Sequence, residues 1–491
     1  MSTGQLGVHN EWNLKGKRVT VLGLGREGTA LARFLVEQGA LVTVSDLKDA
    51  EQLHPALAQL SGMPVRYFLG SHPEEILDCV VLFISPGVPL DAPIVVEARR
   101  RGLTLSSETR FFCRLCPAVI VGITGSSGKT TTATLVAKML EKGGHTVHLG
   151  GNIGNPLINR LPLIQPSDTV VMELSSFQLD FFSPLFDAQP HGDLVSPLFP
   201  PGGWSPPMAA VLNVTPNHLD RHPTMQDYIA AKQKIVRYQR AQDYALLNLD
   251  DAVAQSFASL CPGRVVFFSL SKQVPLGAYL KKDSLMLRSK DREAMVCSVG
   301  EIRLRGRHNV ANVLAACAIA SVFDVPVQAM AEVARTFAGV EHRLEPVCEW
   351  RGVWYYNDSI ATSPERAIAA LNSFAEPIVL LAGGRDKHLP WTDWVNLVRQ
   401  KVVHVIVFGE AATLIARELR KLGVQAPPVH HAESLAHAVR LASELAKPGQ
   451  VVLFSPGGTS FDAFCDYAER GETFKRLVRD LCHLYGTSLD E

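Results

Sequence analysis

A glycine-rich stretch, GITGSSGKTTT at residues 122–132, has the residue types of a loop that binds phosphate groups. It stands between an apolar run and a helical pattern that begins at Lys129. At such a junction, backbone N–H groups at the start of the helix point toward an anion. The Lys129 ammonium would reach the terminal phosphates of a nucleotide, and the Thr130 or Thr131 hydroxyl would bind Mg²⁺. The stretch departs from the strict phosphate-loop pattern at Ile123, where that pattern has glycine.

A second glycine turn, GLGREG at residues 23–28, follows an apolar run closer to the start of the chain. Asp46 ends the next apolar run, near the spacing at which a carboxylate meets a ribose hydroxyl. A dehydrogenase would bind NAD at this turn, and a nucleotide-linked substrate would use the same backbone. Two phosphate-binding loops in one chain favour an ATP-using enzyme whose substrate itself carries a nucleotide.

Three residues of the segment that carries the phosphate loop are candidates for a metal site. Glu173 ends an apolar run, so its carboxylate would lie at a strand end and could bind Mg²⁺ directly or through water. Without that context, a capping role would explain Glu173 equally well. His218 lies in the stretch NVTPNHLDRH, and Lys232 lies in the helical pattern YIAAKQKIV. An unmodified lysine near a metal ion would repel it, which leaves the role of Lys232 open at this point.

Strands and helices must position these residues, and the sequence alternates between them three times. Apolar runs such as RVTVLGLG, AVIVGIT and PIVLLAGG each precede a helical pattern, which is typical of α/β folds with parallel sheets. We predict three α/β domains with boundaries near residues 117 and 342. A Pro- and Gly-rich stretch at residues 183–211 predicts a surface loop, with a functional lid as the alternative.

Composition limits the partners and the compartment. The chain has 491 residues, with 48 Lys and Arg against 48 Asp and Glu, so no charge bias favours nucleic acid or an anionic membrane. The first residues lack the apolar core of a signal peptide, and no apolar run approaches the ~18 residues of a membrane span. The nine cysteines are scattered, so we expect a reducing cytoplasm. We interpret Cys113 and Cys116 as helix-end residues rather than zinc ligands, because no second pair follows at ligand spacing.

Several motifs together resemble those of the Mur ligases. They are TGSSGKTTT, GGNIGNP, ELSSFQL, NVTPNHLDRH, YIAAKQKI, GRHNVANVLAACA, HRLE, NDSIATSPE and SPGGTSFDAF, in the order of that family and over nearly the whole chain. The resemblance implies a Rossmann-like domain for a UDP-linked substrate at residues 1–117. It further implies a phosphate-loop ATPase-like domain at residues 118–342 and a Rossmann-like domain for an amino acid at residues 343–491.

The resemblance also implies the reaction. It implies that ATP drives the addition of D-glutamate to UDP-N-acetylmuramoyl-L-alanine through an acyl phosphate, in peptidoglycan precursor synthesis. It implies Mg²⁺, with two ions, and a carbamylated Lys232, because carbamylation replaces a cationic amine with an anion suited to Mg²⁺. We expect a cytoplasmic monomer that binds neither nucleic acid nor membrane.

Site residues follow from the resemblance position by position. The catalytic residues would be Lys129, His218 and Lys232, and the metal ligands would be Thr130, Glu173, His218 and Lys232. ATP would contact Gly125, Ser126, Ser127, Gly128, Lys129, Thr130, Thr131, Asn309, Asn312, Arg343 and Asp358. The UDP-linked substrate would contact Gly25, Arg26, Glu27, Asp46, Ser85, Gly87, Asn152, Ser175 and Gln178. The carboxylates of the amino acid would bind at Thr362, Lys387, Ser460 and Tyr467.

The chain departs from the family pattern in the third domain. Ile360 stands where the family has lysine, so any contact of that lysine with the substrates is absent or supplied by another residue. SPGGTS at residues 455–460 replaces a more usual Ser-Pro-Ala-x-Ala-Ser. These departures leave open a related ligase that adds L-glutamate or another amino acid.

Two further alternative functions would each leave part of the sequence unexplained. A ligase like folylpolyglutamate synthase would not need the first domain. A nucleotide-dependent binding module that does not ligate would not need the second metal ion that Glu173, His218 and Lys232 indicate.

Overall fold

A computed structural model describes residues 14–153, 156–186, 203–216, 222, 224–290, 292–304, 306–387, 389–423 and 426–486. The described chain divides into two compact units. The first unit runs to residue 302 and includes residues 308–335, and the second contains residues 303–307 and the chain from residue 336 onward. The predicted domain boundaries at residues 117 and 342 stay predictions.

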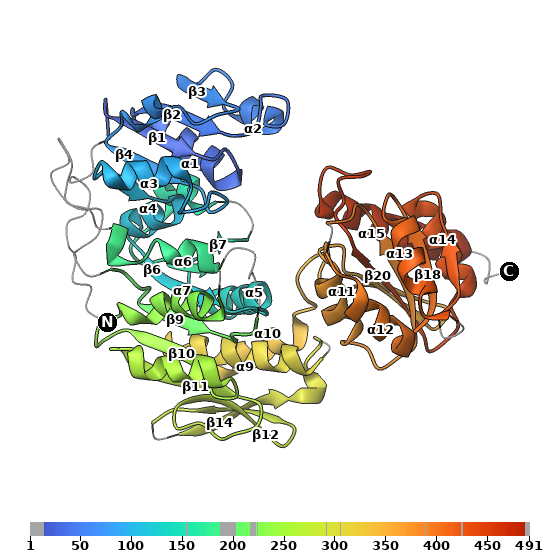
Figure 1. The fold of residues 1–491 in the computed structure, drawn as a ribbon. Coiled ribbons are helices and arrows are strands. Elements are labelled where there is room, and N and C mark those ends of the chain that lie inside the picture. Colours follow the sequence, from blue (N-terminus) through green and yellow to red (C-terminus); the bar gives the residue numbers. More distant parts are fainter. Residues whose placement is uncertain are drawn as a thin grey trace. The chain divides into compact units, whose positions relative to one another are not determined.

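The first sheet of the first unit, drawn in blue in Figure 1, pairs its strands in parallel. Its central strands read as nearly continuous apolar runs, as expected for parallel strands that helices cover on both faces. The strand order is β3 (Val65–Leu69), β2 (Leu41–Asp46), β1 (Arg18–Leu22), β4 (Val81–Ile84) and β5 (Thr104–Ser106). The accompanying helices are α1 (Arg26–Glu37), α2 (His54–Gln59), η1 (Glu74–Leu77), α3 (Pro93–Arg100) and α4 (Glu108–Leu115).

The second sheet of the first unit carries the phosphate loop. Its parallel part has the order β12 (Gly277–Lys281), β11 (Arg264–Ser269), β10 (Tyr244–Asn248), β9 (Met208–Val211), β6 (Val119–Thr124), β8 (Thr169–Glu173) and β7 (Val147–Gly151). Its helices are α5 (Lys129–Lys142), η2 (Leu157–Leu163), α6 (Ser176–Asp180), η3 (Pro184–Phe186), α7 (Met225–Arg237), α8 (Ala252–Ser256), η4 (Phe257–Leu260), η5 (Val299–Glu301), α9 (Arg307–Val322) and α10 (Val327–Thr336). The strands β6 and β8 lie side by side, so their carboxyl ends bring the phosphate loop and Glu173 to one edge.

Two features of this second sheet differ from the sequence-based expectation. At one edge, β12 pairs antiparallel with β13 (Ser284–Arg288), which pairs antiparallel with β14 (Glu293–Ser298), whereas we predicted only parallel alternation. The predicted surface loop at residues 183–211 is wrong at its end, because Met208–Val211 forms the fully buried strand β9 beside β6. Residues 187–202 of that loop, and so the alternative of a lid, lie outside the described residues.

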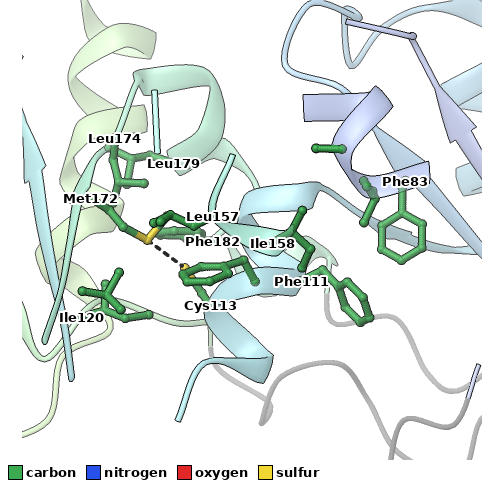
Figure 2. Packing of buried hydrophobic residues seen from close by; sticks show 14 of the residues in the cluster. Phe83, Phe111, Cys113, Ile120, Leu157, Ile158, Met172, Leu174, Leu179 and Phe182 are labelled. Atoms are coloured by element: carbon green, nitrogen blue, oxygen red, sulfur yellow. Dashed lines mark hydrogen bonds between the residues drawn. The ribbon is translucent and has the colours of Figure 1, made fainter. Parts of the chain in front are cut away.

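One hydrophobic cluster joins the two sheets of the first unit. It extends from Phe83 on β4 through Phe111 on α4 to Met172 on β8, as Figure 2 shows. Cys113 lies inside this cluster with its sulfur 4.0 Å from that of Met172, and Cys116 follows the end of α4. The expected placement of both cysteines at a helix end just before a strand is therefore confirmed.

The second unit contains the third sheet. Its strand order is β15 (Glu345–Trp350), β16 (Val353–Asn357), β20 (Val451–Gly457), β17 (Ile378–Gly383), β18 (Val402–Phe408) and β19 (Val429–His431). The edge strand β15 runs antiparallel to β16, and the remaining neighbours pair in parallel. The helices are α11 (Pro364–Leu371), α12 (Thr392–Lys401), α13 (Ala412–Arg420), α14 (Leu435–Leu445) and α15 (Tyr467–Gly486). The three sheets confirm the predicted α/β class.

None of the helices in the described ranges combines the length and the apolar character that are required to cross a membrane.

Candidate active site

The phosphate loop turns tightly between β6 and α5. Gly128 has a φ of 80°, which glycine adopts without strain, and a Cβ atom there would lie 2.4 Å from Oδ1 of Asn312. The Ser127 backbone N–H donates to Oδ1 of Asn213 at 2.8 Å, and the Ser126 hydroxyl donates to the Thr215 carbonyl oxygen at 2.9 Å. Residues that follow β9 thus hold the phosphate loop in place, and α5 begins directly after the loop.

Two lysines meet at the carbonyl oxygen of Gly125. Lys129 Nζ donates to this oxygen at 3.0 Å, and Lys232 Nζ donates to it at 3.2 Å. Lys232 comes from α7, is almost fully buried, and also donates to Oγ1 of Thr124 at 3.1 Å. Burial lowers the pKa of the Lys232 ammonium well below its ordinary value, and the charge of Lys129 lowers it further. The structure therefore brings beside the phosphate loop a buried amine that loses its proton more readily than an exposed lysine does.

Glu173 is the buried acid of this site. Its Oε2 accepts from the Thr130 hydroxyl at 2.7 Å, and its Oε1 accepts from the Asn152 side-chain amide at 2.8 Å. A hydroxyl and a carboxylate at the first turn of a phosphate-loop helix are oxygen ligands of the kind that Mg²⁺ prefers. The residues therefore fit a magnesium ion, which Thr130 and Glu173 would hold.

His218 lies outside the described residues, so its predicted metal and catalytic roles stay predictions. Its neighbour His222 is buried, with Nε2 2.9 Å from the Ser176 hydroxyl and its ring stacked on Phe177. Sequence reasoning gave no role to Tyr228, whose hydroxyl lies 3.1 Å from that of Ser126 and whose ring lies 4.7 Å from Lys232 Nζ. The sequence offered one signal for Tyr228, because it lies one helical turn before Lys232 on α7 and therefore on the same face of that helix.

The predicted adenine contacts lie close to the phosphate loop. Asn312 and Asn309 are buried on α9, and Nδ2 of Asn312 donates to Oδ1 of Asn309 at 3.0 Å. The Thr132 hydroxyl of α5 donates to Asn312 at 3.3 Å. The structure thus brings this pair to the helix that Lys129 begins, and its contact with adenine stays a prediction.

Most residues predicted for the UDP-linked substrate surround the first glycine turn. Asp46 accepts from the Leu24 backbone N–H at 2.7 Å, and the Ser85 hydroxyl donates to the Gly23 carbonyl oxygen at 2.6 Å. A Cβ atom at Gly28 would lie 2.1 Å from that same oxygen, so this turn requires glycine. The predicted residue Gly25 directly precedes α1, Arg26 and Glu27 begin that helix, and Gly87 lies in the turn after β4.

Contacts within the first unit connect this turn to the second sheet. Arg26 Nη2 lies 3.4 Å from the Asn152 carbonyl oxygen, and the Gln178 amide donates to Oε1 of Glu27 at 2.9 Å. Ser175 begins α6 as its cap and accepts from the Gln178 backbone N–H. The structure therefore brings together residues that we predicted for one substrate from two separate motifs.

A buried acidic pair lies behind these contacts. Gln178 Nε2 also donates to the Thr109 hydroxyl at 3.0 Å, and that hydroxyl donates to Glu108 at 3.3 Å. Burial raises the pKa of Glu27 to about 7 and that of Glu108 to about 8, and the charge of Glu27 adds to the second shift. Both side chains therefore hold their protons more firmly than exposed carboxyls.

The Glu108 pKa predicts a pH-dependent stability. Because the folded chain keeps the Glu108 proton that the unfolded chain releases near pH 4.5, the contribution of Glu108 to the free energy of unfolding falls as pH rises from about 4.5 to 8. We expect Glu108→Gln to lessen this fall, so that its melting temperature exceeds that of the wild type by several degrees at pH 8 but not at pH 5. Thermal melts at both pH values test this, with the exposed Glu37→Gln as control. Equal melting profiles for Glu108→Gln and wild type would contradict it.

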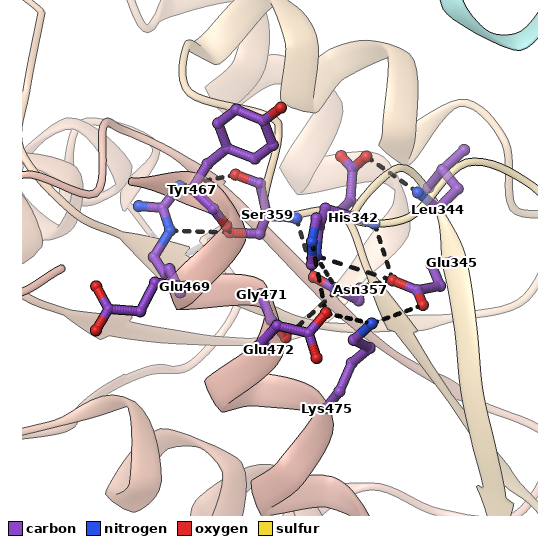
Figure 3. A network of polar contacts seen from close by, with 12 residues as sticks. His342, Leu344, Glu345, Asn357, Ser359, Tyr467, Glu469, Gly471, Glu472 and Lys475 are labelled. Carbon is purple, nitrogen blue, oxygen red and sulfur yellow. Dashed lines mark hydrogen bonds and ion pairs between the residues drawn. The ribbon is translucent and has the colours of Figure 1, made fainter. Parts of the chain in front are cut away.

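In the second unit, polar contacts hold the HRLE segment that contains Arg343 (Figure 3). Asn357 Nδ2 lies 3.0 Å from His342 Nδ1 and donates to Glu345 at 3.1 Å. Both neighbours of Arg343 have left-handed backbones, with φ of 62° at His342 and 45° at Leu344. Such strained residues persist where the surroundings fix them, and these contacts supply that restraint.

The predicted ATP contact Asp358 is buried at the end of β16. It accepts from the Ser455 hydroxyl at 2.8 Å and from the Leu344 backbone N–H at 3.2 Å. Burial raises the pKa of this carboxyl to about 7. The contacts of Arg343 and Asp358 with ATP stay predictions.

The residues predicted for the amino acid follow three adjacent strands of the third sheet. Thr362 follows β16, Ser460 follows β20 and Lys387 follows β17, while Tyr467 begins α15. Because carboxyl ends of neighbouring parallel strands meet at one edge, these loops share that edge. Binding of the amino acid there stays a prediction.

Sequence reasoning missed Arg470, which connects these loops. Its fully buried guanidinium donates to the carbonyl oxygen of Ser359 at 2.8 Å, to the Ser359 hydroxyl at 3.1 Å and to the Gly458 carbonyl oxygen at 3.1 Å. The Ser359 hydroxyl in turn donates to the Tyr467 carbonyl oxygen at 2.7 Å (Figure 3). The sequence offered one signal for Arg470, which is an arginine within the apolar pattern of the last helix. Because arginine is rarely buried without partners, that position could have indicated a buried and hydrogen-bonded side chain.

Family models match all three predicted parts of the chain. The Mur ligase MurD-like N-terminal domain matches residues 17–107, the Mur ligase middle domain matches residues 123–196 and 202–320, and the Mur ligase glutamate ligase domain matches residues 342–458. The chain belongs to the Mur ligase family.

Two similar curated relatives share one name. The UDP-N-acetylmuramoylalanine–D-glutamate ligase of Symbiobacterium thermophilum is 42% identical over 469 residues, covering 95% of this chain and 98% of that protein. The protein of the same name from Acetivibrio thermocellus is 40% identical over 475 residues, covering 95% and 97%. Among solved structures, the UDP-N-acetylmuramate-alanine ligase of Thermotoga maritima covers 95% of this chain and 100% of its own, with a TM-score of 0.58 and 19% identity. That structural likeness supports the fold.

Proposed function

We propose that this chain is the ligase that uses ATP to add D-glutamate to UDP-N-acetylmuramoyl-L-alanine in peptidoglycan precursor synthesis. The observation that carries the proposal is the grouping of Lys129, Thr130, Glu173 and Lys232 around one phosphate loop. This grouping occurs in a chain that is 36–42% identical to ligases named for this reaction. A cytoplasmic location and a monomeric state stay predictions.

The phosphate of ATP solves a leaving-group problem. A carboxylate is a poor electrophile, because attack by an amine would have to expel oxide. Transfer of the γ-phosphoryl group to the alanyl carboxylate forms a P–O bond and releases ADP. The amine of D-glutamate then attacks the carbonyl carbon of the acyl phosphate, and the tetrahedral intermediate expels phosphate to leave an amide. Such a reaction depends mostly on positioning and on neutralising charge.

The residues of the first unit would divide this work. The backbone N–H groups at the start of α5 and the Lys129 ammonium would hold the phosphates, because the N-terminus of a helix favours an anion. Thr130 and Glu173 would hold Mg²⁺, which supplies charge neutralisation on the phosphate oxygens when bound. Lys232, once carbamylated, would add a second anionic ligand beside them.

The amino acid and its handedness decide between the proposal and a related ligase. We expect ADP release from ATP and UDP-N-acetylmuramoyl-L-alanine to depend on D-glutamate, with L-glutamate at least about 10²-fold poorer in kcat/KM. A site that pairs both carboxylates leaves charges unpaired when the wrong enantiomer binds. The assay follows ADP and determines the configuration of the product when both enantiomers compete. Predominant L-product would contradict the proposed amino acid, and ADP release without any amide would favour a module that does not ligate.

A further inference from the structure

Two cationic side chains lie in or directly after the loops expected to bind the amino acid. Lys387 follows β17, and Arg366 lies in the first turn of α11, directly after the loop that carries Thr362. The strand β20 pairs with both β16 and β17, and its following loop carries Ser460. The carboxyl ends of these strands thus bring both cations to the same edge of the third sheet.

Arg366 reaches back to the position at which the family resemblance expects a lysine. Its Nη1 donates to the carbonyl oxygen of Ile360 at 3.3 Å. The Ile360 backbone is itself fixed, because its N–H donates to the His342 carbonyl oxygen at 3.1 Å. The exposed guanidinium is therefore held beside residue 360, whose own side chain is apolar and carries no charge.

The charge of Arg366 affects the pKa values of two side chains near this loop, Lys387 and Asp358. It lowers the pKa of Lys387, although burial is the larger cause of that shift. It also acts to lower the pKa of buried Asp358, against the larger effect of burial. Two cations held within electrostatic reach of each other repel, and an anion placed between them would relieve that repulsion.

We propose that Arg366 binds one carboxylate of the amino-acid substrate and supplies the cation that Ile360 does not provide. Lys387 takes the other carboxylate. The proposal rests on the proposed function, since it assumes a dicarboxylate such as D-glutamate. An arginine suits this role because its planar fork can donate two parallel hydrogen bonds to one carboxylate.

The test compares variants of the full chain by steady-state kinetics for each substrate. Arg366→Gln keeps a donor for the Ile360 carbonyl oxygen but loses the charge, and Arg366→Lys keeps the charge. We expect Arg366→Gln to raise the KM for D-glutamate about 10- to 100-fold, with the KM values for ATP and the UDP-linked substrate within twofold of wild type. We expect the KM of Arg366→Lys for D-glutamate to be at least threefold lower than that of Arg366→Gln. The exposed Arg420→Gln on α13 serves as the control.

Each remaining outcome overturns the assignment. An unchanged KM for D-glutamate in Arg366→Gln, equal impairment of Arg366→Lys and Arg366→Gln, or a rise in the KM for ATP would each exclude a carboxylate contact. These results are distinguishable from failure of the proposed function, in which the wild type itself does not use D-glutamate.

Discussion

Lys129→Ala abolishes ligation and leaves the fold intact. We expect kcat to fall by at least about 10³-fold, because the ammonium neutralises phosphate charge as it builds in the transition state. In the absence of ATP, the variant loses the hydrogen bond from Lys129 Nζ to the Gly125 carbonyl oxygen, and we expect its melting temperature to change little. ADP release and thermal melts measure the two effects.

A second lysine of the same helix provides the matched control. Lys142 ends α5 and pairs with Glu332 at the surface, an interaction worth about 0–1 kcal/mol. Lys142→Ala should keep normal turnover. Normal turnover of a folded Lys129→Ala variant would contradict the assignment of the phosphate loop.

Lys232→Ala is nearly inactive, and a short carboxylate such as formate or acetate restores part of its activity. Carbamate formation requires a neutral amine to attack CO₂, and burial of Lys232 favours that neutral form. Alanine removes the amine and leaves space beside Thr124 that a small anion can enter. The measurements are ADP release with and without added carboxylate, and the carbamate carbon signal of the wild type under ¹³C-labelled CO₂.

Lys234 on the same helix is the control, because it pairs with Asp180 rather than with the phosphate loop. We expect Lys234→Ala to remain active without added carboxylate. Full activity of Lys232→Ala, or a wild type active without any carbamate signal, would refute the modification.

Local pattern predicted the fold class but missed parts of the sheets. Apolar runs that end in glycine, as at residues 119–125, indicated buried parallel strands and the helices after them. The four apolar residues of β9 follow a Pro- and Gly-rich stretch, and so short a run cannot be assigned by periodicity alone. The antiparallel pairs of β12 to β14 depend on hydrogen bonds between segments, which no local pattern records.

The same distinction applies to the candidate site. Motif residues such as Lys129 and Glu173 could be named from the sequence because their chemistry is local to a strand end. The contact from Gln178 to Glu27 spans 151 residues, and that from Arg470 to Ser359 spans 111. Such partners are set by packing of whole elements, so their identity follows from the fold alone.

Arg470 connects three segments of the second unit. Its guanidinium contacts Ser359 and Gly458 directly, and through the Ser359 hydroxyl it is connected to Tyr467. A substitution at residue 470 would remove the contacts to Ser359 and Gly458 at the same time. In evolutionary terms, we expect the loops after β16 and β20 to change together, because one side chain contacts both. We therefore expect that few substitutions in these loops would prevent binding of an inhibitor that depends on their shape and still preserve the native site.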